Sequence, residues 1–383
     1  MMKKRLLCGL LAVLLLPLTA VSVQAADLAE TAPSAILIEQ STGTVLFEKN
    51  DHEKLAPASV TKVMTLLLVM EALDEGRIGW DDMVTASEAA AAKGGSQIYL
   101  EENEQLPMTE MLKSVVVSSA NDCACALAEH VAGSEAAFVE RMNRRAEELG
   151  MTDTHFVNCT GLDDGPDADT HLTTAYDIAL MSCELLKHEK IKDYTTIWMD
   201  TVRGGQFGLS NTNKLVRFYD GTTGLKTGYT SAAGYCLSAS AMRGGMELVA
   251  VVLHCASSVD RFESAKALLN YGFSNYALVT PQAEDGIPPV PVLLGHQDFV
   301  TPVPAQDTPL LLEKGLVSQV QTSVRVDDTV SAPVQAGQQL GTMTVSAGEQ
   351  VLAEIPLVAP SDVAARTWLD VWAELLKNIC MTK

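Results

Sequence analysis

Three short segments of the chain carry residue types that suit acyl transfer by a serine. They are Ser59-Val60-Thr61-Lys62, Ser119-Ala120-Asn121 and Lys226-Thr227-Gly228. A serine hydroxyl is a weak nucleophile until a neighbouring base takes its proton. Each segment alone is common among proteins, so the prediction depends on all three occurring in one chain.

Ser59 is expected where a helix begins. Apolar residues follow Pro57 at helical spacing: Val63, Leu66, Leu67 and Met70. Lys62 would then lie one turn after Ser59, beside its hydroxyl. A neutral amine there can act as the base if burial, or a second cation such as Lys226, lowers its pKa. The helix N-terminus would add a backbone N–H for an oxyanion. Taken alone, the pair is better explained as a helix-capping serine and a solvated lysine.

The second segment, Ser119-Ala120-Asn121, is expected in a loop between two helices. The Ser119 hydroxyl and the Asn121 amide can pass protons and hold a substrate amide there. Serine and asparagine are also ordinary loop residues, so this segment is the least specific of the three.

The third segment is expected on a strand. Lys226 and Thr227 can bind a carboxylate, and Gly228 would let a ligand backbone approach closely. The backbone N–H of Tyr229 can serve as a second oxyanion donor. The alternative interpretation is an edge strand with a polar face.

The elements around these segments predict an α+β domain over residues 26–275. Residues 35–48 read as a β-hairpin, and strands are expected at 226–230, 235–241 and 248–254. Helices are expected at about 107–132, 134–149, 173–189 and 259–272. Strands at both ends with helices between them imply an antiparallel sheet with a helical subdomain.

Beyond residue 275 the pattern changes twice. Prolines separate short apolar runs such as Val290–Leu294, Val317–Val326 and Gln350–Pro356, which predicts a small all-β domain over 276–360. Residues 361–383 are predicted as an amphipathic helix, formed by Asp362–Met381. Its apolar face holds Trp368, Val371, Trp372, Leu375, Leu376 and Ile379, and its polar face holds Asp370, Glu374, Lys377 and Asn378. Such a helix suits a membrane interface; a helix packed on the protein is the alternative.

Residues 1–25 have the pattern of a secretory signal. Lys3, Lys4 and Arg5 precede the apolar run Leu6–Leu18, and small residues suit cleavage after Ala25. A retained N-terminal anchor is the alternative, but the run is short for a membrane span. Cleavage removes three bases and no acids, so the net charge falls from −21 to −24. This charge excludes a nucleic-acid binder.

Cysteines and histidines predict neither disulfides nor a metal site. Seven cysteines remain after cleavage, an odd number without paired spacing. Cys123 and Cys125 are two apart on an expected helix, so they do not share a face. The histidines are scattered, and no cofactor is predicted.

The chain resembles the serine-type D-alanyl-D-alanine carboxypeptidases, the low-molecular-mass penicillin-binding proteins. The similar segments are 56–62, Ser119-Ala120-Asn121-Asp122, 171–177, 211–215 and 224–230. The resemblance implies a β-lactamase/transpeptidase-like domain in which Ser59 is acylated and Lys62 is its base. It further implies that Ser119 and Asn121 form the second motif, while Lys226 and Thr227 hold the terminal carboxylate. Gly228 and Tyr229 stand beside them, with Tyr229 where many relatives carry histidine.

The implied activity is removal of the terminal D-Ala from peptidoglycan stem peptides, with inhibition by β-lactams. The resemblance also implies an exported enzyme, held peripherally at the outer face of the cytoplasmic membrane or cell wall by its C-terminal helix. A class A β-lactamase is one alternative, but residues 122–225 lack its Glu-x-x-Leu-Asn element. A catalytically idle peptidoglycan-binding protein is another, and the intact Ser59 and Lys62 argue against it.

Overall fold

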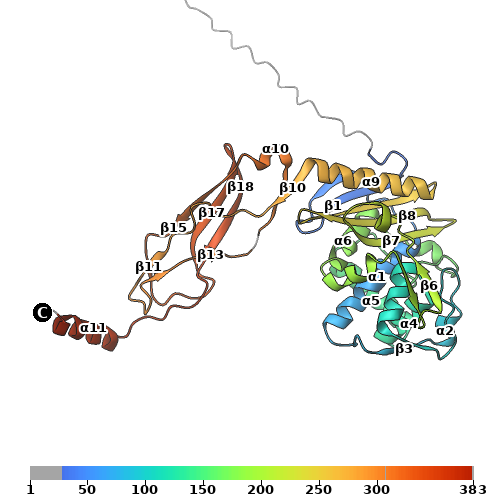
Figure 1. Cartoon of the computed structure of the whole chain (residues 1–383), viewed down its shortest axis with the longest axis horizontal. Coiled ribbons are helices and arrows are strands. Elements are labelled where there is room, and N and C mark those ends of the chain that lie inside the picture. The colour runs from blue at the N-terminus through green and yellow to red at the C-terminus, as the bar shows by residue number, and fades with distance from the viewer. Residues whose placement is uncertain (1–27, 307, 382–383) are drawn as a thin grey trace, which may run out of the picture.

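The computed structural model describes residues 28–306 and 308–381. The predicted signal at 1–25 lies outside these residues. Three parts follow one another along the chain: a large part with a sheet and many helices, a smaller β-rich part, and a terminal helix (Figure 1). Among the described residues, no helix has the length and apolar character needed to cross a membrane.

The large part is built on a five-stranded antiparallel sheet in the order β2-β1-β9-β8-β7. Its strands are β1 (Ser34–Glu39), β2 (Val45–Lys49), β7 (Thr222–Thr230), β8 (Gly234–Arg243) and β9 (Met246–Cys255). The predicted hairpin is therefore confirmed, as are the three later strands, each with slightly wider bounds. The last strand in this order, β7, forms one edge of the sheet and carries the Lys226 segment.

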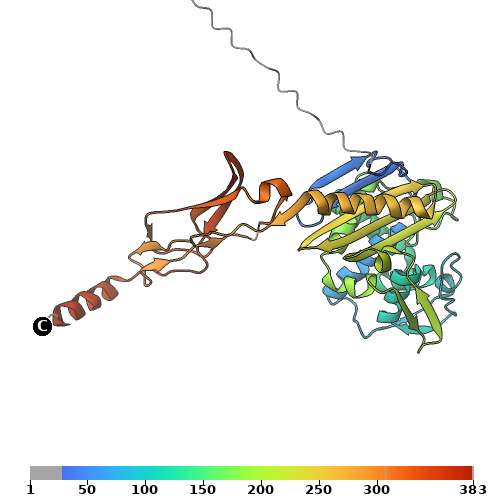
Figure 2. The ribbon, with the colours of Figure 1, turned by 45° about the horizontal axis from the view of Figure 1, so that its top comes forward.

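Both faces of this sheet are covered, because apolar residues occur in succession along its inner strands. Alternate residues point to opposite faces. Leu37, Leu248 and Val252 therefore pack under helix α9 (Ser258–Asn275), together with Phe262, Leu268 and Leu269 of that helix. Figure 2 shows α9 lying along one face of the sheet, with most of the other helices of this part on the opposite face.

The opposite face supports the helices that position the first two segments. Ile36, Val249 and Val251 belong to the core on that side. Its main helices are α1 (Lys62–Asp74), α3 (Met108–Ser118), α4 (Asn121–Ala132), α5 (Glu135–Glu148) and α6 (Ala175–Leu185). In α1, every residue except Glu71 and Asp74 is buried. A helix that is apolar on all sides is stable only at the centre of a core. Helix α1 therefore holds Lys62, its first residue, in a fixed position.

Shorter elements complete the large part. They are η1 (Ala58–Thr61), β3 (Met83–Thr85), α2 (Glu88–Ala91), β4 (Gln105–Pro107), η2 (Ala168–Thr170), η3 (Glu189–Ile191), α7 (Lys192–Thr195), β5 (Met199–Val202), β6 (Phe207–Ser210) and α8 (Leu215–Phe218). Strands β3 and β4 pair with each other, as do β5 and β6, outside the main sheet.

The β-rich part has two small cores of its own. Its four-stranded sheet contains β13 (Val303–Pro304), β18 (Gln350–Val358), β17 (Gln339–Ala347) and β15 (Val320–Val326). Strand β11 (Val290–Leu293) pairs with β12 (Phe299–Val300) and β16 (Val330–Ser331), and β10 (Tyr276–Val279) pairs with β14 (Leu310–Glu313).

A helical turn interrupts this part where the sequence predicted a strand from Val317. Residues Lys314–Val317 form α10, and the strand begins at Val320. The Lys314 side chain donates a hydrogen bond of 2.6 Å to the carbonyl of Phe273 at the end of α9. This long-range contact, which a local pattern does not reveal, accompanies the turn.

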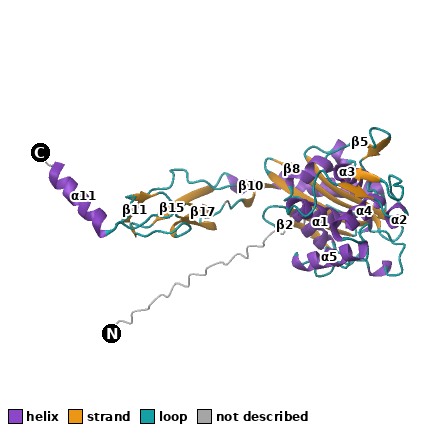
Figure 3. Cartoon of the chain, turned by 90° about the horizontal axis from the view of Figure 1, so that it is seen from below, coloured by secondary structure: helices purple, strands orange, loops and turns teal. Residues whose placement is uncertain are grey.

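The terminal helix α11 (Trp368–Met381) begins at Trp368, so the predicted start at Asp362 is wrong. Val363 is buried and exchanges two backbone hydrogen bonds with Val334, which keeps residues before the helix in the β-rich part. Thr367 and Asp370 then cap the helix. The helix extends away from both other parts, as Figure 3 shows.

Candidate active site

Ser59 lies in a 3₁₀ turn, η1, that leads directly into α1. The sequence predicted a helix N-terminus here, and the structure places Ser59 just before the α-helical residues. Ala58 has φ +47, a left-handed conformation that an alanine adopts only under constraint from its surroundings. Ser59 is partly exposed, although the neighbours Ala58 and Val60 are buried. The Ser59 hydroxyl is therefore accessible, while the residues on either side of it are held in the core.

Lys62 is fully buried, and its Nζ lies 3.0 Å from the Ser59 Oγ. Nζ also donates a hydrogen bond of 2.8 Å to the carbonyl of Thr160. Burial lowers the pKa of Lys62 from 10.5 to about 7, because an ammonium group is costly away from water. The nearby Asp122 carboxylate opposes this fall. A solvated lysine, the plainer interpretation of the sequence, is thus ruled out.

The segment around Thr160 packs tightly against the Ser59 turn. Gly161 has φ +80, and a Cβ there would lie 1.9 Å from the carbonyl oxygen of Ala58. Only glycine fits this position. Beside it, Thr61 and His171 are joined by a hydrogen bond of 2.8 Å at Nε2 of the ring. The Val157 N–H donates to Nδ1, so Nε2 carries the proton and donates to Thr61.

The second segment connects α3 to α4, as predicted. Ser119 ends α3 with φ 62, in the left-handed region. Asn121 begins α4, and its Nδ2 donates to the carbonyl of Gly94 over 2.7 Å. In the part of the chain that the structure describes, the buried Ser119 Oγ and Asn121 Oδ1 have no hydrogen-bond partner. Unpaired buried polar atoms are rare in proteins and suit contact with a substrate or water.

The third segment lies on β7, which packs against the Ser59 turn. A Cβ on Gly228 would lie 2.6 Å from the carbonyl oxygen of Pro57 and 3.1 Å from the amide nitrogen of Val60. Because Gly228 has no side chain, the Ser59 turn of the same chain can pack closely against β7. This differs from the predicted reason, which was close approach of a ligand backbone.

The hydroxyl of Thr227 links the third segment to the second. Thr227 Oγ1 donates to Thr212 Oγ1 over 2.7 Å, and the Thr212 N–H donates to the carbonyl of Val117, two residues before Ser119. The Tyr229 side chain points to solvent, 55% exposed, and lies against Tyr235 with ring centroids 4.4 Å apart. The fold thus brings all three segments to one place.

Lys226 is buried, and its Nζ donates to the carbonyl of Thr227 over 2.9 Å. Burial lowers its pKa well below the usual value, with the charges of Lys62 and Arg261 adding to the effect. The sequence left two possible causes for a lowered pKa of Lys62, which were burial and a second cation such as Lys226. Burial is the main cause.

Several residues that support the site were not singled out from the sequence. The Asp122 carboxylate accepts hydrogen bonds from the backbone N–H groups of Ile98, Leu100 and Cys123, which fixes the segment beside Asn121. The buried Arg261 of α9 donates to the carbonyl of Gly228 over 2.9 Å. The local sequence does not indicate a role for Arg261, because its contact joins α9 to β7, which are far apart in the chain.

This arrangement can carry out acyl transfer by a serine. The hydroxyl of Ser59 is in reach of a carbonyl from solvent, and a nitrogen that is half neutral near pH 7 lies beside it. Strand β7 packs against the Ser59 turn, so backbone N–H groups of both elements are candidates to bind an oxyanion.

Comparison with known proteins gives the same assignment. The family model described as D-alanyl-D-alanine carboxypeptidase matches residues 19–257. A second model, the C-terminal domain of penicillin-binding protein 5, matches residues 278–365. The D-alanyl-D-alanine carboxypeptidase DacF of Bacillus subtilis (strain 168) is 43% identical over 342 residues, which cover 88% of this chain and 87% of the relative.

Solved structures agree with these matches. Penicillin-binding protein 5 of Haemophilus influenzae aligns with a TM-score of 0.73 and 30% identity, covering 87% of this chain and 98% of its own. Penicillin-binding protein D2 of Listeria monocytogenes, in its ampicillin-bound form, aligns with a TM-score of 0.58 and 30% identity. That alignment covers 63% of this chain and 98% of the other.

Proposed function

The chain belongs to the D-alanyl-D-alanine carboxypeptidase family and shares its activity, and we propose that Ser59 is the nucleophile of this reaction. The observation that carries the proposal is the 3.0 Å contact between Ser59 Oγ and the buried Lys62 Nζ. The substrate is a peptidoglycan stem peptide that ends in D-Ala-D-Ala, and the product is the peptide shortened by one D-Ala.

In the first step, neutral Lys62 takes the proton of Ser59 while the Ser59 oxygen attacks the carbonyl carbon of the penultimate D-Ala. The backbone N–H groups of Ser59 and Tyr229 stabilise the oxyanion. The bond between carbon and nitrogen then breaks, and the leaving D-Ala amine receives the proton that Lys62 accepted. Ser59 remains as an ester of the shortened peptide.

In the second step, water hydrolyses this ester. We assign the transfer of the water's proton to Lys62, beside the Ser59 oxygen, and to Ser119, whose buried hydroxyl has no hydrogen-bond partner among the described residues. A β-lactam acylates Ser59 in the same way, but the C–N bond that breaks is part of its ring, so the released amine stays attached to the acyl group and obstructs the water. The ampicillin-bound relative supports inhibition by this route.

Lys226 and Thr227 are assigned to the terminal carboxylate of the substrate, and Asn121 to a substrate amide. The Thr227 hydroxyl is held by Thr212, and β7 is the edge strand of its sheet. An edge strand can pair with an extended peptide through its backbone. Gly228 and Tyr229 continue that edge beside Ser59.

The other two parts are assigned to placing the enzyme at the wall. We divide the chain at 275/276, supported by the two family models and by the two cores that the β-rich part has of its own. Helix α11 exposes the described apolar side chains Trp368, Trp372 and Leu375, each more than half accessible to solvent. Such a helix suits the interface of a membrane. The enzyme would then act outside the cytoplasmic membrane as a peripheral protein after export.

Release of D-Ala from a diacetylated tripeptide ending in D-Ala-D-Ala tests the proposed function. The wild-type protein should release one D-Ala per peptide, and Ser59→Ala should release none. A class A β-lactamase would instead turn over penicillin rapidly and leave the peptide intact. An idle peptidoglycan-binding protein would retain the peptide without releasing D-Ala.

A further inference from the structure

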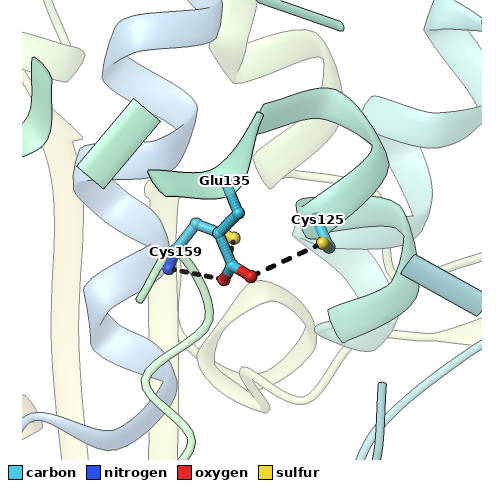
Figure 4. A group of neighbouring side chains, drawn as sticks. All are labelled: Cys125, Glu135 and Cys159. Atoms are coloured by element: carbon cyan, nitrogen blue, oxygen red, sulfur yellow. Dashed lines mark hydrogen bonds between the residues drawn. The ribbon is translucent and has the colours of Figure 1, made fainter. Parts of the chain in front are cut away.

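Behind the Lys62 site, the fold brings two cysteines and a carboxylate together. Cys125 of α4, Glu135 at the start of α5 and Cys159 place their ligand atoms within 4.8 Å of one another. Among the residues whose side chains the structure describes, no other group of three histidine, cysteine or acidic side chains is this close. Figure 4 shows the Glu135 carboxylate directed between the two cysteines.

The contacts within this group are directed at the carboxylate. The Cys159 Sγ lies 3.2 Å from Glu135 Oε1, and the Cys125 Sγ lies 3.8 Å from Glu135 Oε2. The backbone N–H of Cys159 also donates to Oε1. Both cysteines are fully buried, while Glu135 is 23% exposed. An ion can therefore reach the group past the carboxylate.

We propose that Cys125, Glu135 and Cys159 form a binding site for a thiophilic divalent cation of the zinc class. Zinc takes thiolate and carboxylate ligands in closely spaced sets of three or four. Calcium and magnesium prefer oxygen ligands and do not suit two sulfurs.

The charges of the three ligands are compensated when the cation is bound, while the Glu129 carboxylate, 3.9 Å from Cys125 Sγ, adds one more negative charge that attracts a cation. Binding of one divalent ion to two thiols and one carboxylate releases two protons and leaves two thiolates. The three negative ligands then face the two charges of the ion and the one charge of Lys93, whose Nζ lies 2.6 Å from Glu135 Oε2. A buried group of this kind is stable only when its charges are compensated.

The proposed metal site is connected to Lys62 through the backbone of Cys159 and Thr160. Cys159 precedes Thr160, whose carbonyl accepts the hydrogen bond of Lys62, and the Cys159 carbonyl accepts one of 2.6 Å from Thr65 of α1. Cys125 lies one helical turn after Asn121. A bound cation would therefore hold α4 to the segment that orients Lys62, as a structural staple that takes no part in the chemical steps.

Cobalt(II) is the first probe, because thiolate ligands give its complexes a strong charge-transfer absorption in the near ultraviolet. The reduced, metal-free mature protein should bind one equivalent with this absorption, and zinc should displace it. Cys125→Ser and Cys159→Ser should each abolish the band, and Glu135→Gln should weaken binding by about tenfold or more. Cys123→Ser is the matched control, since Cys123 is equally buried on α4 but belongs to no such group.

Native mass spectrometry of the wild-type protein decides the matter even if a serine variant fails to fold. The zinc complex should weigh one zinc more and two protons less than the metal-free protein. Zinc bound without loss of two protons would overturn the proposal. So would a cobalt band that survives in folded Cys125→Ser, or a wild-type protein in which a disulfide joins Cys125 to Cys159. None of these outcomes depends on whether Ser59 is acylated.

Discussion

The Nζ of Lys62 lies between the Ser59 hydroxyl, at 3.0 Å, and the carbonyl of Thr160, at 2.8 Å, with no exposed surface of its own. A lysine held in this way is half neutral near pH 7. The same burial that prepares it to act as a base also makes its charged form costly. Replacing Lys62 by an uncharged residue should therefore lower the activity and raise the stability of the fold.

The rate of acylation by a β-lactam should follow the neutral fraction of Lys62. Because the pKa of Lys62 is about 7, the rate should rise with pH through that value and level off above it. One pH unit below 7, it should be about tenfold lower than the plateau. Stopped-flow measurement with a chromogenic cephalosporin from pH 5.5 to 9 checks this, and a rate independent of pH across that range would contradict it.

Replacing the lysine by an uncharged residue of similar length should remove acylation and stabilise the fold. Lys62→Met is expected to lower the acylation rate by at least about 1,000-fold, while Ser119→Ala keeps a measurable rate. The pKa of Lys62 falls from 10.5 in the unfolded chain to about 7, so burial of the ammonium opposes folding. That penalty is fully present below pH 7 and disappears as pH rises to 10.5.

Urea unfolding at pH 7 should accordingly show Lys62→Met to be more stable than the wild type by about 1–3 kcal/mol, since lost hydrogen bonds offset part of the gain. The difference should shrink as pH approaches 10. A variant that is less stable at pH 7, or one that is still acylated at a normal rate, would refute this account of Lys62.

Gly228→Ala should separate β7 from the Ser59 turn. The new Cβ would lie 2.6 Å from the carbonyl oxygen of Pro57, and a displacement of about 1 Å in an active site lowers the rate by about 100-fold. Gly208→Ala, on β6, is the control, because nothing lies within 4 Å of that position. Equal acylation rates for the two variants would show that the close contact is unimportant.

Asp122→Asn should loosen the segment next to Asn121. The carboxylate accepts three backbone N–H groups and is fully buried. An amide accepts them less well and brings donors of its own, so the cost should be about 2 kcal/mol in urea unfolding. Asp81→Asn, at an exposed position, should cost nothing measurable. Equal stability of the two variants would contradict the role given to Asp122.

Much of the large part could be predicted from periodicity. The runs in β8 and β9 bury both faces, and the ends of α3 and α4 enclose Ser119-Ala120-Asn121 as expected. The start of α11 could not be predicted, because the pairing of Val363 with Val334 overrides the local helical pattern. The Cys125–Glu135–Cys159 group was also missed, since only the packing of three separate segments brings these residues together.

The proposed membrane role of α11 can be tested by removing the helix at its true start. A cut after Pro360 would remove the buried Val363 and damage the β-rich part, whereas a cut after Thr367 removes the helix alone. The protein shortened after Thr367 should keep its activity on a small peptide and no longer float with liposomes. Trp372→Glu should weaken flotation of the whole chain, and unchanged flotation in both would refute the anchor.

Mass spectrometry of the protein treated with benzylpenicillin tests the central claim most directly. After digestion, the penicilloyl adduct should be found on the peptide that contains Ser59, with one adduct per folded molecule, and it should be absent from Ser59→Ala. An adduct on another residue, or no adduct on protein shown to be folded, would contradict the assignment of Ser59 as the nucleophile.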